Sequence, residues 1–461
     1  MKKNQSRRAF LARSAALGVV GAASPFVLNL AAIGEAAAAT AIDYKALVCL
    51  FMYGGNDYAN TLVPYDQNSY DLYNGFRKSI ALPRADLAAT VLNPTLALPQ
   101  GRQYALAPGL APVWPVFNSG KMAAVLNVGT LVQPTTKAQY LANSVKLPPK
   151  LFSHNDQQSF WQACNPEGAT SGWGGRMGDL LQSGNGNMTL TCINPSGNAV
   201  FMTGKSAVQY AISIRGPIAL NTASGLFGSS ANGDILRSIM TNSSSDVLQN
   251  EYSRITRRSL DSYGQVAAAL QTAPITKTPW PAKNMIADQL SIVAKMISVS
   301  GDLGAKRQIF FVSMGQFDTH DGIPTKHPVL MDTVGKALKA FYDTTVELGI
   351  SDKVTTFTAS DFGRTLTANT DGSDHGWGSM HFVLGGAVNG NQLYGTPPVV
   401  ADNGPDDVGH GRLLPSISVD QYAFTMAKWF GVLDTDMKIV LPNIDNYVLP
   451  GQYAGWNLGF V

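Results

Sequence analysis

The sequence has little charge and almost no cysteine. Only 14% of its 461 residues are Asp, Glu, Lys or Arg, and three are cysteine. The net charge of the whole chain is +3, but the first 39 residues hold five basic residues and one acidic residue, so the remainder carries about −1. Because no basic patch or stripe remains, the chain lacks the electrostatic footprint of nucleic-acid binding or polybasic membrane binding. We expect no nucleic acid among its partners.

Two further sequence signals are missing or undecided. The residues after the first predicted strand, Gly54–Asp57, read G-G-N-D and not G-x-G-x-x-G, so the fingerprint of a dinucleotide-dependent oxidoreductase is absent. Cys49 lies in an apolar stretch and is expected in the core. Cys164 and Cys192 either pair in an oxidising compartment or stay free, because sequence alone does not fix their distance.

The N-terminus has the pattern of an export signal. Residues 6–11, S-R-R-A-F-L, form a twin-arginine motif, followed by an apolar stretch at 15–32 and by small residues at 36–39. The alternative is a membrane anchor, but the apolar stretch contains residues that make a poor spanning helix: Gly18, Gly21, Pro25 and Asn29. We therefore expect residues 1–39 to be a signal peptide, with the twin-arginine translocase as partner. The mature protein would be periplasmic or secreted, with no stable membrane span.

Apolar strands alternate with amphipathic helices over residues 40–461. Strands are predicted at 46–53, 121–128, 307–314, 353–359 and 381–384, and helices at 110–117, 176–182, 247–270, 284–298, 328–348 and 419–430. This alternation predicts a single α/β domain whose mainly parallel sheet is sandwiched by helices. The periodic pattern weakens over 195–282, which we interpret as a helical insertion or cap.

Acidic residues and histidines follow three of the predicted strands. Because the carboxyl ends of parallel strands meet at one crevice, we expect these side chains to converge there. Carboxylate oxygens and imidazole nitrogens are suitable ligands for a divalent cation such as Zn, Ca, Mg or Mn. The predicted metal ligands are Asp57, Asp318, His320, Asp361, Asp374 and His375.

Several of these residues also have a structural interpretation. Asp57 after two glycines fits an Asx-turn. Asp361 would fit a cap paired with Arg364, while the Arg364 guanidinium would equally suit an oxyanion. His154 stands in the polar, Trp- and Gly-rich stretch 151–180, which is typical of a loop lining a site.

The other three histidines have weaker links to a site. His381 begins a strand and is predicted to be structural, and His327, just before Pro328, is predicted to cap a surface helix. His410 in G-H-G-R fits either a structural or a functional role.

Six motifs together resemble a known family: G-G-N-D-Y-A-N-T-L-V-P (54–64), F-S-H-N-D-Q (152–157), F-D-T-H-D (317–321), S-D-F-G-R-T (360–365), D-H-G-W-G (374–378) and G-R-L-L-P-S-I-S-V-D-Q-Y (411–422). They are similar to those of domain-of-unknown-function family 1501, bacterial proteins that are commonly exported by the twin-arginine route. That family resembles the alkaline-phosphatase and sulfatase superfamily in fold and in placing acidic and histidine ligands at strand ends. The resemblance implies an alkaline-phosphatase-like core.

The superfamily resemblance also implies roles for individual residues. Asp57 matches the aspartate after the first strand, and Thr135 or Thr136 stands near the position of the nucleophile. Phe362 stands where the phosphatases carry a histidine, and no C-x-P-x-R or S-x-P-x-R signature is present. With His154 and Arg364, the threonines complete the predicted catalytic set.

The resulting expectation is an exported, metal-dependent hydrolase of phosphate or sulfate esters, with a small-molecule or glycan ester as substrate. The alternative is a non-catalytic envelope protein that keeps the same scaffold and binds a glycan, a lipid or a partner protein.

Export through the twin-arginine route gives a direct prediction. Replacing Arg7 and Arg8 by lysine should leave the precursor in the cytoplasm, because the translocase reads the arginine pair as an address. Cell fractionation followed by immunoblotting measures this. An undiminished periplasmic fraction of the double variant would show that export uses another route.

Overall fold

The structure is a computed structural model that describes residues 43–220, 229–450 and 452–461. The expected signal peptide, residues 1–39, lies outside the described residues. A mixed, mostly parallel sheet forms the centre, in the order β11-β4-β10-β9-β1-β8-β5-β6-β7, with β12 beside β4. Its strands are β1 (Lys45–Met52), β4 (Met122–Gly129), β5 (Cys192–Asn194), β6 (Gln209–Ser213), β7 (Gly216–Pro217), β8 (Arg307–Met314), β9 (Val354–Ser360), β10 (Ser379–Gly385), β11 (Gln392–Tyr394) and β12 (Ile417–Ser418). A small separate sheet pairs β2 (Leu62–Pro64) with β3 (Tyr104–Leu106).

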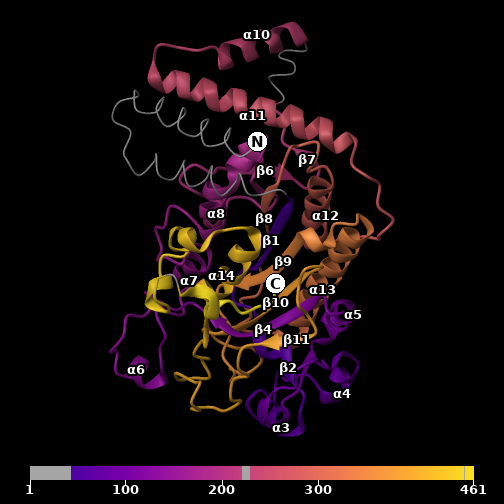
Figure 1. Cartoon of the computed structure of the whole chain (residues 1–461). Coiled ribbons are helices and arrows are strands. Elements are labelled where there is room, and N and C mark those ends of the chain that lie inside the picture. The colour runs from indigo at the N-terminus through magenta and orange to yellow at the C-terminus, as the bar shows by residue number, and fades with distance from the viewer. Residues whose placement is uncertain (1–42, 221–228, 451) are drawn as a thin grey trace, which may run out of the picture.

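Helices surround the sheet (Figure 1), which confirms the predicted α/β class. They are α3 (Gln67–Phe76), α4 (Arg84–Leu87), α5 (Trp114–Asn118), α6 (Lys137–Leu141), α7 (His154–Ala163), α8 (Trp173–Leu181), α10 (Ser230–Thr241), α11 (Val247–Gln271), α12 (Met285–Ser298), α13 (Ile323–Glu347), α14 (Val419–Phe430) and α15 (Met437–Val440). Among the described residues, no helix has the length and apolar character needed to cross a membrane.

The alternation of side chains along β1 divides the core into two layers. Ala46, Val48 and Leu50 pack in one apolar cluster with residues of α12 and α13. Leu47, Cys49 and Phe51 point to the opposite face and pack with α7, α8 and α14. Because both faces are covered, the strand reads as a continuous apolar run, as is typical of a parallel sheet inside an α/β protein.

Parallel pairing brings three strand ends to one edge of the sheet. β1 lies between β8 and β9, parallel to both. β10 departs from the parallel pattern, since it runs antiparallel to β9 and β4. Its first residue therefore lies at the edge where β1, β8 and β9 end, and the segment 374–378 just before it joins the loops at that edge.

The stretch 195–282 has two parts. β6 and β7 extend the central sheet beyond β5. The helices α10 and α11 lie outside it, at the top of the view in Figure 1. Residues 221–228 are not among the described residues.

Buried side chains answer two questions that the sequence left open. Cys164 and Cys192 are both buried and both free, so they do not form a disulfide. The prediction that His327 caps a surface helix is wrong. α13 begins at Ile323, so His327 lies within it, and its side chain is buried against Asn56 and Thr61.

Burial also makes two histidines acid-sensitive. Burial lowers the pKa of His381 to about 3 and that of His327 to about 4, because the charged imidazolium loses its hydration. The ring of His381 packs between Trp161 and Tyr422. In the unfolded chain these two histidines take up protons near the ordinary pKa of histidine. In the folded chain they stay neutral to a lower pH.

We predict that the free energy of unfolding falls as the pH drops from about 6.5 toward 4, by about 3 kcal/mol for each of these two histidines. Above about pH 6.5 their contribution is fully present. Urea unfolding at several pH values measures the slope. His381→Phe keeps a flat ring between Trp161 and Tyr422 but does not titrate, so its slope should be smaller. An unchanged slope in this variant would contradict the assignment.

Candidate metal centre

The carboxylate of Asp318, in the loop after β8, is the centre of a histidine cluster. Its Oδ1 atom lies 3.1 Å from Nε2 of His320 and 3.2 Å from Nε2 of His375. Its Oδ2 atom lies 3.4 Å from Nε2 of His154. The Nε2 atoms of His320 and His375 are 2.9 Å apart. Three imidazoles from segments far apart in sequence therefore point the same ring nitrogen at one carboxylate.

The opposite nitrogen, Nδ1, of each histidine contacts an oxygen. The partners are the carboxylate of Asp361 for His154 (2.7 Å), the carboxylate of Asp374 for His320 (3.2 Å) and the backbone carbonyl of Phe152 for His375 (2.8 Å). Carbonyl and carboxylate oxygens accept hydrogen bonds, so each Nδ1 is the donor. A ring in its neutral form then presents the lone pair of Nε2 to Asp318. A histidine that binds a metal commonly donates its other N–H to such an oxygen.

Asp361 is buried and orients the loops around it. Its Oδ2 atom accepts hydrogen bonds from the Gly54 amide (3.1 Å), from Nε2 of Gln158 (2.8 Å) and from His154. Gly54 has φ of 116°, and a Cβ there would lie 2.3 Å from the amide nitrogen of Asp318, so only glycine allows this close approach. Asp361 thus joins the loop after β1 to α7 and acts on the cluster through His154.

The charges in the cluster shift its pKa values in opposite directions. The hydrogen bond to Asp361 raises the pKa of His154, although burial opposes this. Burial lowers the pKa of His375. Burial alone would raise the pKa of Asp318, but the hydrogen bond and charge of Arg364 outweigh it and lower the pKa. Asp318 is therefore held as a carboxylate at neutral pH.

Arg364 is fully engaged within the protein. Its guanidinium donates to the Asp318 carboxylate (2.8 Å), to the carbonyl of Gly54 (3.1 Å) and to the carbonyl of Ser373 (3.0 Å from Nε). Its side chain is 0% exposed. The sequence suggests either an ion pair with Asp361 or an oxyanion-binding role for Arg364. In the structure Arg364 forms an ion pair, and its partner is Asp318. Each of the three nitrogens of its guanidinium has an acceptor among the described residues.

Asp57 is not among the side chains that contact Asp318. Its carboxylate forms a fully buried ion pair with Arg77, at the end of α3. Arg77 also donates to the carbonyls of Thr365 (2.8 Å) and Leu366 (3.1 Å). The pair therefore ties the loop after β1 to the loop after β9.

Other predicted site residues lie in different surroundings. Thr136 is exposed and caps α6, and Thr135 donates to the carbonyl of Gln133 (3.0 Å). Across the described part of the chain, no hydrogen bond joins either threonine to the histidines. Asp374 contacts His320 only through Nδ1, so it stands behind that ring and not beside Nε2.

Phe362 occupies the space between the loops. Its ring lies 4.9 Å from the ring of His154 and 4.7 Å from that of His375, measured between centroids. A Cβ on Gly55 would meet this ring at 2.3 Å. The departure from the phosphatase pattern at this position therefore gives an apolar support for two imidazoles and no additional ligand.

Sequence reasoning missed three contributors to this arrangement. The carbonyl of Phe152 holds His375, Gln158 holds Asp361, and Arg77 neutralises Asp57. The motif 152–157 marked the right segment, but nothing in it shows that a backbone carbonyl would face a histidine. Arg77 stands in no recognised motif, so no sequence signal pointed to it.

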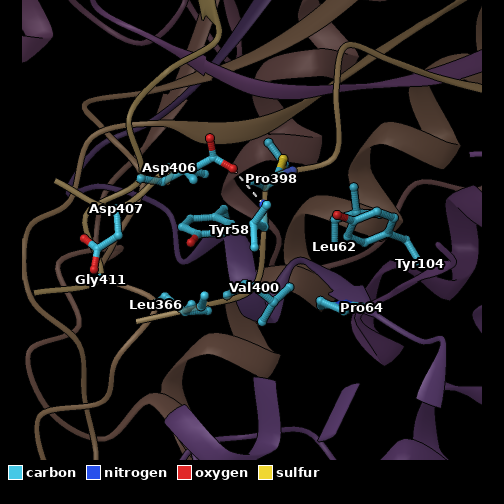
Figure 2. A pocket seen from close by; sticks show the side chains of 15 residues that line it. Tyr58, Leu62, Pro64, Tyr104, Leu366, Pro398, Val400, Asp406, Asp407 and Gly411 are labelled. Atoms are coloured by element: carbon cyan, nitrogen blue, oxygen red, sulfur yellow. Dashed lines mark hydrogen bonds between the residues drawn. The ribbon is translucent and has the colours of Figure 1, made fainter. Parts of the chain in front are cut away.

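A mainly apolar pocket lies beside these loops (Figure 2). Tyr58, Leu366 and Val400 line it, with Asp406 and Asp407 at one end and Tyr104 at the other. Its cavity volume is about 30 Å³, which is room for about two water molecules. The histidine cluster, in contrast, is open to solvent, since the side chains of Asp318 and His320 are 43% and 47% exposed.

The fold and the cluster define an α/β protein with a histidine and carboxylate centre at the carboxyl edge of its sheet. Residues 44–426 match the family described as Protein of unknown function (DUF1501), and the chain belongs to this family. The resemblance found in the sequence motifs is confirmed at this level. No curated protein matches the chain.

Solved structures show only distant similarity. Ps i-CgsB in complex with k-i-k-neocarrahexaose has 11% identity and a TM-score of 0.35, covering 88% of this chain and 77% of that chain. The PsFucS1 sulfatase from Pseudoalteromonas sp. has 9% identity and a TM-score of 0.34, covering 89% and 73%. Similarity at this level does not transfer an activity to this chain.

The buried ion pair gives a prediction that separates a structural role from a ligand role. Asp57→Asn should lower the free energy of unfolding by about 3–5 kcal/mol, because Arg77 would stay buried without a counter-charge. Chemical denaturation measures this. The same variant should keep the metal content of the wild type, since Asp57 does not contact Asp318. Unchanged stability together with lost metal would identify Asp57 as a ligand instead.

Proposed function

We propose that the protein binds a divalent cation through Nε2 of His154, His320 and His375 and a carboxylate oxygen of Asp318. One observation carries this proposal: three Nε2 atoms converge on one carboxylate while every Nδ1 faces another oxygen. Lone pairs that face a carboxylate repel it unless positive charge lies between them. A single proton can form a hydrogen bond between only one Nε2 atom and the carboxylate, whereas a metal cation can bind all three Nε2 atoms and the carboxylate together.

The donor set and its spacing support this interpretation. Bonds of about 2.0–2.1 Å to a tetrahedral zinc ion place neighbouring ligand atoms about 3.3 Å apart. Nε2 of His320 and Nε2 of His375 lie 3.1 and 3.2 Å from Oδ1 of Asp318, and Nε2 of His154 lies 3.4 Å from Oδ2. Ligand atoms of His154, Asp318 and His375 all lie within 4.8 Å of one another, and His320 completes the set through Oδ1. Three imidazoles suit zinc and similar transition ions, whereas calcium and magnesium prefer oxygen ligands. Among the four ions expected from the sequence, we therefore propose zinc.

We further propose that the protein is an exported, metal-dependent hydrolase of phosphate or sulfate esters. A bound cation would supply positive charge that polarises an ester oxygen and lowers the pKa of a water molecule. Asp361, Asp374 and the Phe152 carbonyl fix the rings, and Arg364 keeps Asp318 ionised. Because no hydrogen bond among the described residues joins Thr135 or Thr136 to the histidines, we propose water as the attacking group.

A non-catalytic binding protein is the second candidate. It is favoured by the engagement of every Arg364 nitrogen within the protein and by the place of Phe362, whose ring packs against His154 and His375. In that case the cation would hold a ligand without turnover. Measuring turnover and metal content on the same preparation separates the two candidates.

Metal analysis of the purified mature protein tests the proposed centre. We expect one zinc ion per chain, and His154→Ala, His320→Ala and His375→Ala should each lower the metal content, since every ring supplies one ligand. His410→Asn is the matched control. His410 is an exposed histidine outside the cluster with φ of 60°, which asparagine tolerates.

Activity is tested with a panel of phosphate and sulfate esters. The wild type should hydrolyse at least one ester, chelation should abolish the reaction, and zinc should restore it. The histidine variants should be inactive yet folded by circular dichroism. Stoichiometric metal without turnover on any ester would favour the binding protein. Wild-type protein that takes up no metal, and whose melting temperature zinc does not change, would rule out the centre.

A further inference from the structure

Arg412 is held beside the cluster by two contacts. Its Nε atom donates to the backbone carbonyl of His375 at 3.2 Å. Its guanidinium carbon lies 4.3 Å from the ring centroid of Phe152. The same Phe152 supplies the carbonyl that accepts from Nδ1 of His375. One aromatic residue therefore positions both a ring of the cluster and the neighbouring guanidinium.

The outer end of Arg412 is available. Over the described residues, its two terminal nitrogens have no hydrogen-bond partner, and no carboxylate lies within ion-pair distance. These nitrogens are also not among the buried, unpartnered atoms of the protein, so they reach solvent. Arg364, by contrast, is 0% exposed and uses all its nitrogens internally. Of these two arginines beside the cluster, Arg412 is the one free to meet a ligand.

We propose that Arg412 is an anion-binding residue that holds a tetrahedral oxyanion, the phosphate or sulfate group of a substrate, next to the histidine cluster. This rests on the proposed function and adds to it the residue that selects an anionic ester. The stack on Phe152 and the bond from Nε fix the plane of the guanidinium before a ligand arrives. Its two terminal N–H groups then form a fork that matches two oxygens of such an anion.

The chain contains a close structural control. The guanidinium of Arg84, on α4, lies 4.4 Å from the ring centroid of Tyr65, and its Nε donates to a backbone carbonyl at 3.1 Å. Like Arg412, Arg84 stacks its guanidinium on an aromatic ring and donates its Nε hydrogen to a backbone carbonyl. No hydrogen bond or ion pair joins Arg84 to the described residues of the cluster. Arg84→Gln removes an equivalent side chain from another place.

Calorimetric titration of zinc-loaded protein with inorganic phosphate, and separately with inorganic sulfate, tests the assignment. Arg412→Gln should weaken binding by roughly ten- to hundredfold, the usual loss for hydrogen bonds to a charged group. Arg412→Lys should give an intermediate loss, because it keeps the charge and loses the fork. Arg84→Gln should bind like the wild type. Zinc content, measured on the same samples, should be equal in all four proteins.

Each other outcome has a distinct meaning. Equal anion affinity in wild type and Arg412→Gln, or no anion binding by zinc-loaded wild type, would overturn the inference while leaving the metal centre standing. Loss of zinc in Arg412→Gln would make Arg412 a residue that positions His375, which also overturns it. Wild-type protein that binds no zinc, yet binds phosphate through Arg412, would support the anion site and refute the proposed metal centre.

Discussion

The register of three parallel strands is the constraint on which the centre depends. Met52, the last residue of β1, lies opposite Met314 of β8 and Ser360 of β9. All three strands therefore end level, and their loops begin at the same height above the sheet. A slip by one residue would turn the side chains of β1 to the opposite layer. The close packing of the two layers opposes this slip, because each face of β1 is fitted to different neighbouring side chains.

This constraint explains how much the sequence could predict. Apolar strands and amphipathic helices follow from local periodicity, and the acidic and histidine residues after the strands follow from where the strands end. The partners of those residues depend on tertiary contacts that periodicity does not contain. Asp57 follows β1 as predicted, yet it pairs with Arg77 from a helix twenty residues away. His154 was assigned to a loop but begins α7, which brings its ring over the end of β8.

The roles of the carboxylates show why residue type alone does not identify ligands. Asp318 and Asp361 follow strands, Asp374 precedes β10, and all three contact histidines. Only Asp318 meets Nε2, while Asp361 and Asp374 meet Nδ1 and orient the rings. Which nitrogen faces which oxygen depends on ring rotation within packed loops. A sequence pattern therefore finds the members of such a centre more easily than the part each one plays.

The two arginines illustrate the same point for charge. Arg364 and Arg412 each stand in one of the family motifs, and both lie close to His375. The backbone of Arg364 forms a β-bridge with that of His375, and Nε of Arg412 donates to the carbonyl of His375. Arg364 is buried and neutralises Asp318, so its charge belongs to the interior. Arg412 rests on Phe152 with its terminal nitrogens in solvent. A guanidinium already neutralised by a carboxylate attracts anions weakly, whereas a partly exposed, oriented one such as that of Arg412 retains its field. Burial, more than residue type, thus decides which arginine can recognise a ligand.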